Sequence, residues 1–355
     1  MKAVKRCPRC GVPEGVGKAH CWRTNGIITE KSDPDHRMVL SEAGSLDRLF
    51  ERVEERIGLS IEPIIIEAKA LSTRLYWESM LPHWKRRVAL RIGFEKLVER
   101  LRQQGRVMGY GDICFEEVSM VKGRPDYVSI LLKDPYSVPL FIGDFKGVCE
   151  AVAGICASVE YERLEDGWYR LRATNSGLPV EEPERLGIRY YPLKPGNVVM
   201  ERCGRCRAPL ALSTMDWDVE AGTILDRSSG RRMALFGPGG VNSVFRELEL
   251  ELGEGVPQMI VEAEKQNTLE RALRSEALMG VEKFREVTAL RGLGNLAAYD
   301  TSGLRLSIRI ENPAFPLLAT GLAWGLYEIA MGAEARCTWR VRRDGDLQVE
   351  IEKSV

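Results

Sequence analysis

The chain contains two copies of one unit, and this duplication constrains its fold more than any other feature. The motif Cys7-Pro-Arg-Cys10 returns as Cys203-Gly-Arg-Cys206. Matching residues then follow in the same order almost to the C-terminus: Trp22 and Trp217, Gly26 and Gly222, Arg37 and Arg232, Gly58 and Gly253, Glu67 and Glu262, Gly109 and Gly292, Glu150 and Glu328. Because self-similarity of this length marks a repeated structural unit, we expect two similar domains.

The length and composition are sufficient for two domains. The chain has 355 residues, of which 44% are hydrophobic, and an ordinary domain needs roughly 100 to 200 residues. We predict a first module over residues 1–174 and a second over residues 198–355, each with its own CxxC pair. Several prolines stand among charged residues between the modules, so we interpret residues 175–197 as a linker.

Each copy has the same predicted order of elements, taken from periodicity and turn residues. Two short strands are followed by an amphipathic helix that ends at Gly58 or Gly253, with Ser45 and Asn242 as expected N-caps. For the rest of the first copy, the pattern predicts helical segments over 64–103, strands at 112–120 and 126–133, a helix over 138–153 and a hairpin over 157–172. This order predicts an α/β (α+β) fold, in which each module is an antiparallel sheet covered by helices and the modules pack as a pseudo-twofold dimer.

The charge balance and the cysteine content restrict the class of protein. Lys plus Arg and Asp plus Glu both number 51, which argues against nucleic-acid binding. No apolar stretch reaches the length of a membrane span, and the N-terminus lacks the layout of a signal peptide, so we expect a cytoplasmic protein with no membrane span. The nine cysteines are an odd number in a large chain, which is typical of thiol or metal chemistry and not of a disulfide framework.

The two CxxC pairs predict a structural zinc site. Two cysteines separated by two residues supply two corners of a tetrahedral zinc, and a second pair completes it. If the copies pack about a twofold axis, both pairs meet at one site. The candidate ligands are Cys7, Cys10, Cys203 and Cys206.

Other interpretations of these cysteines remain open at the level of sequence. A zinc site within the first copy would use His20 and Cys21, and the second copy cannot reproduce it because Met215 and Asp216 stand near the matching positions. The pairs can also be a redox couple or inert thiols. A zinc with four thiolate ligands has no open position, so the favoured site is structural and not catalytic.

A run of glycines and apolar residues in the second copy resembles a known family. The run comprises Gly292-Leu-Gly294, Asn312-Pro313, the helix Gly321 to Glu328, Gly332 and Cys337-Thr-Trp339, and the first copy repeats the pattern from Gly109 to Ala173. These segments resemble the C-terminal half of V4R (4-vinyl reductase, hydrocarbon-binding) domains, which are similar in fold to core subunits of the TRAPP vesicle-tethering complex. The resemblance implies a pocket for an apolar small molecule. Sensor members of the family carry a zinc site near the final hairpin, and only Cys337 stands at such a position here.

The candidate ligand-binding residues come from two sources. The first copy alone carries an aromatic cluster that is suited to line a pocket, although ordinary helix packing would also explain it. Two glutamates occupy matching places in apolar helices, where they either face a cavity or serve as solvent-exposed or capping residues. The proposed set is Trp77, His83, Trp84, Glu150, Trp324 and Glu328.

Together these features predict a binding protein for a small hydrophobic or aromatic ligand that acts as a sensor, carrier or accessory factor, with a possible protein partner. The first alternative is an enzyme acting on a hydrophobic or tetrapyrrole substrate, which predicts convergent polar groups around Glu150, Glu328 or His83. The second is a scaffold like the tethering subunits, which predicts a filled core and an exposed apolar patch. With three histidines and no nucleophile elbow, the sequence favours a role other than catalysis.

Overall fold

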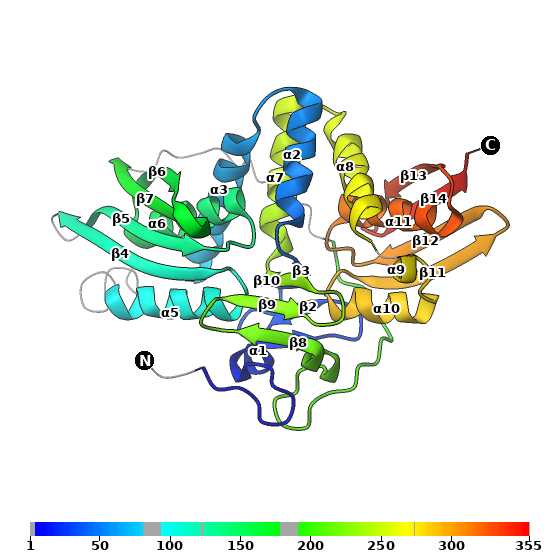
Figure 1. Ribbon diagram of the computed structural model, residues 1–355, viewed down its shortest axis with the longest axis horizontal. Helices are drawn as coiled ribbons and strands as arrows, with labels where there is room; N and C mark the ends of the chain where they lie inside the picture. The colour runs from blue at the N-terminus through cyan, green and yellow to red at the C-terminus, as the bar shows by residue number, and fades with distance from the viewer. Residues whose placement is uncertain (1–3, 81–93, 122–123, 178–190, 273, 355) are drawn as a thin grey trace.

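The computed structural model describes residues 4–80, 94–121, 124–177, 191–272 and 274–354, which form a mixed α+β fold with antiparallel sheets (Figure 1). A central six-stranded sheet has the order β1-β2-β3-β10-β9-β8. A four-stranded sheet lies on each side of the molecule, and helices α2 and α7 stand side by side between them. No helix within the described ranges is both long and apolar enough to cross a membrane.

The first copy supplies the elements from α1 to β7. They are α1 (Glu14–Ala19), β1 (His20–Trp22), β2 (Ile28–Glu30), β3 (Arg37–Glu42), α2 (Ser45–Ile57), α3 (Glu62–Met80), α5 (Phe94–Val107), β4 (Asp112–Val121), β5 (Arg124–Lys133), α6 (Val138–Ala153), β6 (Cys156–Arg163), a 3-10 turn (Glu165–Gly167) and β7 (Trp168–Gly177). Part of the expected linker, 178–190, falls outside the described residues.

The second copy supplies the elements from β8 onward. They are a 3-10 turn (Leu210–Thr214), β8 (Met215–Asp218), β9 (Thr223–Asp226), β10 (Arg231–Phe236), α7 (Pro238–Leu252), α8 (Val256–Arg271), α9 (Arg274–Ala277), α10 (Val281–Leu290), β11 (Asn295–Ser302), β12 (Arg305–Glu311), α11 (Pro316–Met331), β13 (Ala335–Val341) and β14 (Leu347–Lys353).

Most predicted elements are present, and most differences lie at the start of each copy. In addition, β7 reaches Gly177 and so takes in residues 175–177 of the expected linker. The helix predicted over 138–153 matches α6, but strands β1 and β8 were not predicted. The predicted N-caps are wrong. Ser45 is the first residue of α2, and its hydroxyl donates to the Glu42 carbonyl. Asn242 lies in the second turn of α7, because Pro238 starts that helix earlier, and its amide donates to the Ala314 carbonyl.

The central sheet joins the two copies through one strand pair. Strand β3 pairs antiparallel with β10, and Leu40 lies directly opposite Leu235, its matching residue in the other copy. The Leu40 amide donates to the Arg291 carbonyl and the Leu235 amide donates to the Met108 carbonyl, at 2.9 and 2.8 Å. The two copies therefore share backbone hydrogen bonds in addition to the linker.

Glycines of the two copies contact each other reciprocally. The Gly294 amide donates to the Gly26 carbonyl at 3.0 Å, and the Gly111 amide donates to the Gly222 carbonyl at 2.9 Å. In each case a turn near the CxxC motif of one copy lies against the glycine pair of the other. Such an exchange between matching residues is the contact pattern of an isologous interface.

The outer sheets have matching topology and matching helix packing. Their orders are β4-β5-β7-β6 and β11-β12-β14-β13, covered by α3 with α6 and by α8 with α11. Glycines permit the close approach of each helix pair. A methyl group at Gly147 would lie 2.4 Å from the Ala70 carbonyl oxygen, and one at Gly325 would lie 2.6 Å from the Thr268 Cβ.

Substitution of Gly26 tests the interlocked packing of the copies. A methyl group there would lie 2.1 Å from the Gly294 carbonyl oxygen, whereas one at Gly58 meets nothing within 4 Å, and both glycines have φ +73°. We expect Gly58→Ala to cost about 1 to 2 kcal/mol for the left-handed backbone. Gly26→Ala should cost about 1 to 3 kcal/mol more, because of the steric overlap. Equal losses in chemical denaturation would contradict the reciprocal packing.

Candidate metal centre and ligand cavity

Each CxxC motif folds into a tight turn with the same backbone geometry. The Gly11 amide donates to the Cys7 carbonyl at 2.8 Å, and the Arg207 amide donates to the Cys203 carbonyl at 2.9 Å. Gly11 and Arg207, each following the second cysteine of its pair, have φ of 76° and 67°. The left-handed residue closes the turn so that both thiols of a pair point to the same side.

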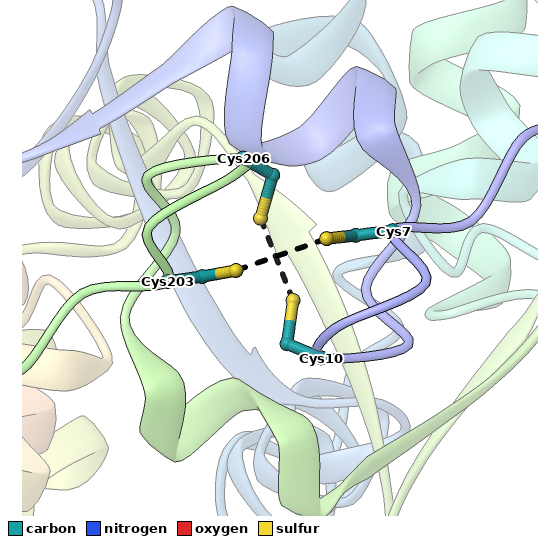
Figure 2. Close-up of side chains that lie close together, drawn as sticks. All are labelled: Cys7, Cys10, Cys203 and Cys206. Atoms are coloured by element: carbon teal, nitrogen blue, oxygen red, sulfur yellow. Dashed lines mark hydrogen bonds between the residues drawn. The ribbon is translucent and has the colours of Figure 1, made fainter.

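The two turns bring all four thiols together (Figure 2). The four sulfur atoms lie within 4.8 Å of one another and belong to buried residues. Cys7 Sγ lies 3.7 Å from Cys203 Sγ, and Cys10 Sγ lies 3.4 Å from Cys206 Sγ. Four ligands about 2.3 Å from a tetrahedral zinc are separated by roughly 3.8 Å. This buried group therefore can bind a metal ion.

The electrostatics of the thiols suit a cation. Backbone amides of Cys206 and Arg205 lower the pKa of Cys203 to about 6. Burial raises the pKa of Cys10 to about 12, because a thiolate is poorly solvated away from water. A bound cation offsets that penalty, since it stabilises the deprotonated form of every ligand.

The surroundings of the thiols are apolar and again reciprocal. Trp22 and Trp217 belong to the same buried cluster as the four cysteines. The Arg6 guanidinium donates to the Trp217 carbonyl, and the Arg202 guanidinium donates to the Trp22 carbonyl. Each turn is thus fixed to the other copy's β-strand, which positions the sulfur atoms before any ion binds.

His20 and Cys21, the residues of the alternative site, do not belong to the metal-binding group found among the described residues. His20 is 5% exposed, and its Nδ1 donates to the Val16 carbonyl at 3.0 Å. Burial lowers the pKa of its imidazole. Its Nε2 is buried without a hydrogen-bond partner in the described structure.

A large cavity, open to solvent over part of its surface, lies in the first copy and extends to the second. Its volume is about 1430 Å³. The walls come from α3, α5 and α6, from strands β4, β5 and β7, from the start of α7, and from residues 312–317. A drug-sized ligand pocket usually measures about 300 to 1,000 Å³, so this space is sufficient for a small molecule.

The predicted ligand-binding residues fall into three groups. Trp77 lines the cavity, together with its neighbour Tyr76. His83 and Trp84 lie outside the described residues. The remaining members of the predicted set are not among the described residues that line the cavity; they are Glu150, Trp324 and Glu328.

Glu150 and Glu328 have the same position and the same partner in each copy. Glu150 Oε1 accepts from the Ala157 amide at 3.1 Å, and Glu328 Oε1 accepts from the Ala335 amide at 2.9 Å. Both carboxylates are buried, with exposures of 4% and 7%. Burial raises the pKa of Glu150. Each glutamate therefore fixes the corner between an apolar helix and the strand that follows.

Trp324 belongs to the environment of Glu328. Its Nε1 donates to Glu328 Oε1 at 3.0 Å, and Lys265 Nζ lies 4.3 Å above its ring. Lys265 also forms an ion pair with Glu328 at 2.9 Å. Trp324 lines a separate and smaller pocket of about 320 Å³ between α2 of the first copy and α8 of the second.

A polar cluster on the cavity wall was missed by the sequence analysis. Lys69 Nζ lies 2.8 Å from Asp144 Oδ1, which also accepts from the Thr73 hydroxyl at 2.7 Å. Tyr136 donates to Asp144 Oδ2 at 2.7 Å. A comparison of the two copies could have indicated this cluster, because the second copy has Glu264 and Leu322 at the positions of Lys69 and Asp144 and so lacks the pair.

A larger side chain stands in the second copy at one position that lines the cavity in the first. Tyr327 stands at the position of Cys149, which lines the cavity in the first copy. Tyr327 is 8% exposed, and its hydroxyl donates to the Leu304 carbonyl at 2.5 Å. Its ring packs in an apolar cluster with residues of β12 and β14, among them Ile308 and Val349.

No family model matches the chain, and neither does any curated protein or solved structure.

Metal content tests the arrangement of the four thiols. We expect about one metal ion per chain, because both CxxC pairs contribute to a single group. The double substitution Cys203→Ser and Cys206→Ser should abolish the bound metal and lower the melting temperature by about 10 °C, since bound metal stabilises the fold. Metal analysis with Cys21→Ser as the control is the measurement. Two ions per chain, or one ion retained by the double variant, would contradict a shared site.

Proposed function

We propose that this protein binds a small hydrophobic or aromatic molecule in its first copy. In this proposal the chain is a tandem V4R-like pseudo-dimer, pinned by a structural zinc, that acts as a sensor, carrier or accessory factor. The cavity of about 1430 Å³ is the observation on which the proposal depends. A concave space of this size with largely apolar walls is the usual form of a small-molecule binding site.

The chemistry of the cavity walls favours an apolar ligand. Side chains from α5, α6 and the outer sheet are largely aliphatic or aromatic, among them Leu101, Ile130, Phe145 and Val148. Largely apolar walls with a small number of placed polar groups are the usual composition of a small-molecule site, and here charged side chains such as Arg102 and Asp126 also line the cavity. The ligand would gain free energy from removal of its apolar surface from water, at about 25 cal/mol per Å².

The difference between the copies supports one binding site and one bracing copy. Where the first copy has His36 and Tyr76 at the cavity, the second has Arg231 and Arg271. These arginines form ion pairs instead: Arg231 contacts Glu276 at 2.7 Å, and Arg271 contacts Glu42. In this proposal these ion pairs and Tyr327 occupy the region of the second copy that corresponds to the cavity.

The metal in this proposal is zinc with a structural role. Four thiolates match the ligand preference of zinc, and a site closed by four cysteines leaves no position for a substrate. Its place between the copies suits a clasp that holds the two halves together.

Two alternatives are less well supported. The enzyme hypothesis placed its chemistry around Glu150, Glu328 or His83. Both carboxylates accept hydrogen bonds from strand amides, and His83 lies outside the described residues. The scaffold hypothesis predicts a filled core, which the cavity in the first copy opposes. A protein partner that receives a signal is compatible with the binding role and forms part of the proposal.

Filling the cavity tests the proposed function. We expect Cys149→Tyr, which copies the residue of the second copy, to reduce binding of an apolar fluorescent probe by at least about tenfold, because the ring would occupy the ligand space. Cys149→Ala removes the thiol without filling the cavity and should leave binding unchanged. Both are measured by titration and by native mass spectrometry of protein from its own host. Unchanged binding in Cys149→Tyr would refute the cavity as the site.

A further inference from the structure

The cavity has an apolar body and a polar end. Apolar side chains from two helices form the body, including Leu97 and Leu101 on α5 and Val148 and Val152 on α6. The polar end lies where the first copy meets α7 of the second copy. A ligand that fills both parts must itself have an apolar part and a polar part.

The groups at the polar end lie close to one another. Lys69 pairs with Asp144 at 2.8 Å, and a methyl group at Gly240 would lie 2.7 Å from Lys69 Nζ. The ring of Tyr110 lies 4.7 Å from that of Tyr136, whose hydroxyl donates to Asp144. Lys69 and Tyr110 therefore converge on the same region of the cavity wall.

These groups offer hydrogen-bond donors in excess of acceptors. Both oxygens of Asp144 already accept hydrogen bonds or an ion pair from the protein. The Lys69 ammonium has three N–H donors, and Asp144 is its one partner in the described structure. The Tyr110 hydroxyl has no hydrogen-bond partner among the described residues. A ligand group that accepts hydrogen bonds would satisfy this wall.

The start of helix α7 adds to this preference. Gly237, Pro238, Gly239 and Gly240 all line the cavity, and no side chain caps the helix. The free amides of a first helical turn favour an acceptor, and the helix dipole favours negative charge.

Acidic residues also line the cavity. Glu30, whose Oε2 accepts from the Tyr76 hydroxyl at 3.4 Å, and Asp33 are half-buried, whereas Asp35 is exposed. Water and salt screen the charge of Asp35. Lys69, in contrast, is 7% exposed, so its charge acts more strongly on a bound group.

We infer that the ligand of the cavity is an amphiphile with an apolar body and a carboxylate at one end. This inference rests on the proposed function. The body lies between α5, α6 and the outer sheet, and the carboxylate accepts from Lys69, from Tyr110 and from the start of α7. The second copy has Glu264 and Leu293 at the positions of Lys69 and Tyr110, so it lacks both donors.

The test compares two probes of equal chain length and opposite head group. Dodecanoate should bind the wild-type protein at least about tenfold more tightly than dodecylamine, because the ammonium group can neither accept from these donors nor approach Lys69 without repulsion. Calorimetric titration below the micellar concentration measures both affinities. Equal affinities, or tighter binding of dodecylamine, would overturn the carboxylate inference while leaving a binding cavity. Absence of binding by either probe would overturn both proposals.

Variants at the polar end assign the effect to named residues. Lys69→Met should weaken dodecanoate about tenfold, and Tyr110→Phe about threefold, with little change for dodecylamine. Tyr110→Phe removes only a hydroxyl, so it keeps the test decisive if Lys69→Met fails to fold. Glu264→Gln, the matching position of Lys69, and Tyr161→Phe on the outer surface are controls that should bind as wild type. The assignment would be refuted if the control variants lost as much dodecanoate affinity as the Lys69 and Tyr110 variants. It would also be refuted if the Lys69 and Tyr110 variants lost none.

Discussion

The structure depends on the antiparallel pairing of β3 with β10, which joins the two copies in one sheet. Leu40 lies opposite its own counterpart Leu235 in that pair, so contacts made by one copy near this point recur in the other. The glycine contacts, the arginine contacts to the tryptophan carbonyls and the convergence of the four thiols all follow from it. A metal at the thiols would act on an interface that backbone hydrogen bonds already define.

The duplicated sequence gave rise to two different interiors. Both copies keep the glycines that let helices approach closely and the glutamates that fix the helix-to-strand corner. They differ at a few interior positions. Tyr327 and Glu264 of the second copy stand at the sequence positions that match Cys149 and Lys69 of the first. Changes of this kind alter the volume and charge of an interior without altering the backbone. One backbone can therefore carry interiors that differ in volume and charge at matching positions.

The sequence was sufficient for the features that depend on local pattern or on repetition. Apolar periodicity located α6, and the repeated CxxC pairs predicted the four-thiol group. The sequence was insufficient for features whose formation depends on contacts between residues far apart in the chain. Strands β1 and β8 have three and four residues, too few for a clear alternation, and they form because the shared sheet offers an edge. Lys69 and Asp144 were missed because they lie far apart in sequence and meet only when α3 packs on α6.

The central claim is that one of two sibling folds holds a ligand while both share a metal at their interface. An experimental density map of protein purified from its own host tests it most directly, with anomalous scattering recorded at the zinc edge. The account predicts one anomalous peak among the four cysteine sulfurs and residual density between α5 and α6, with none at the matching place in the second copy. A cavity closed by side chains, or CxxC turns that stand apart without a shared peak, would contradict it.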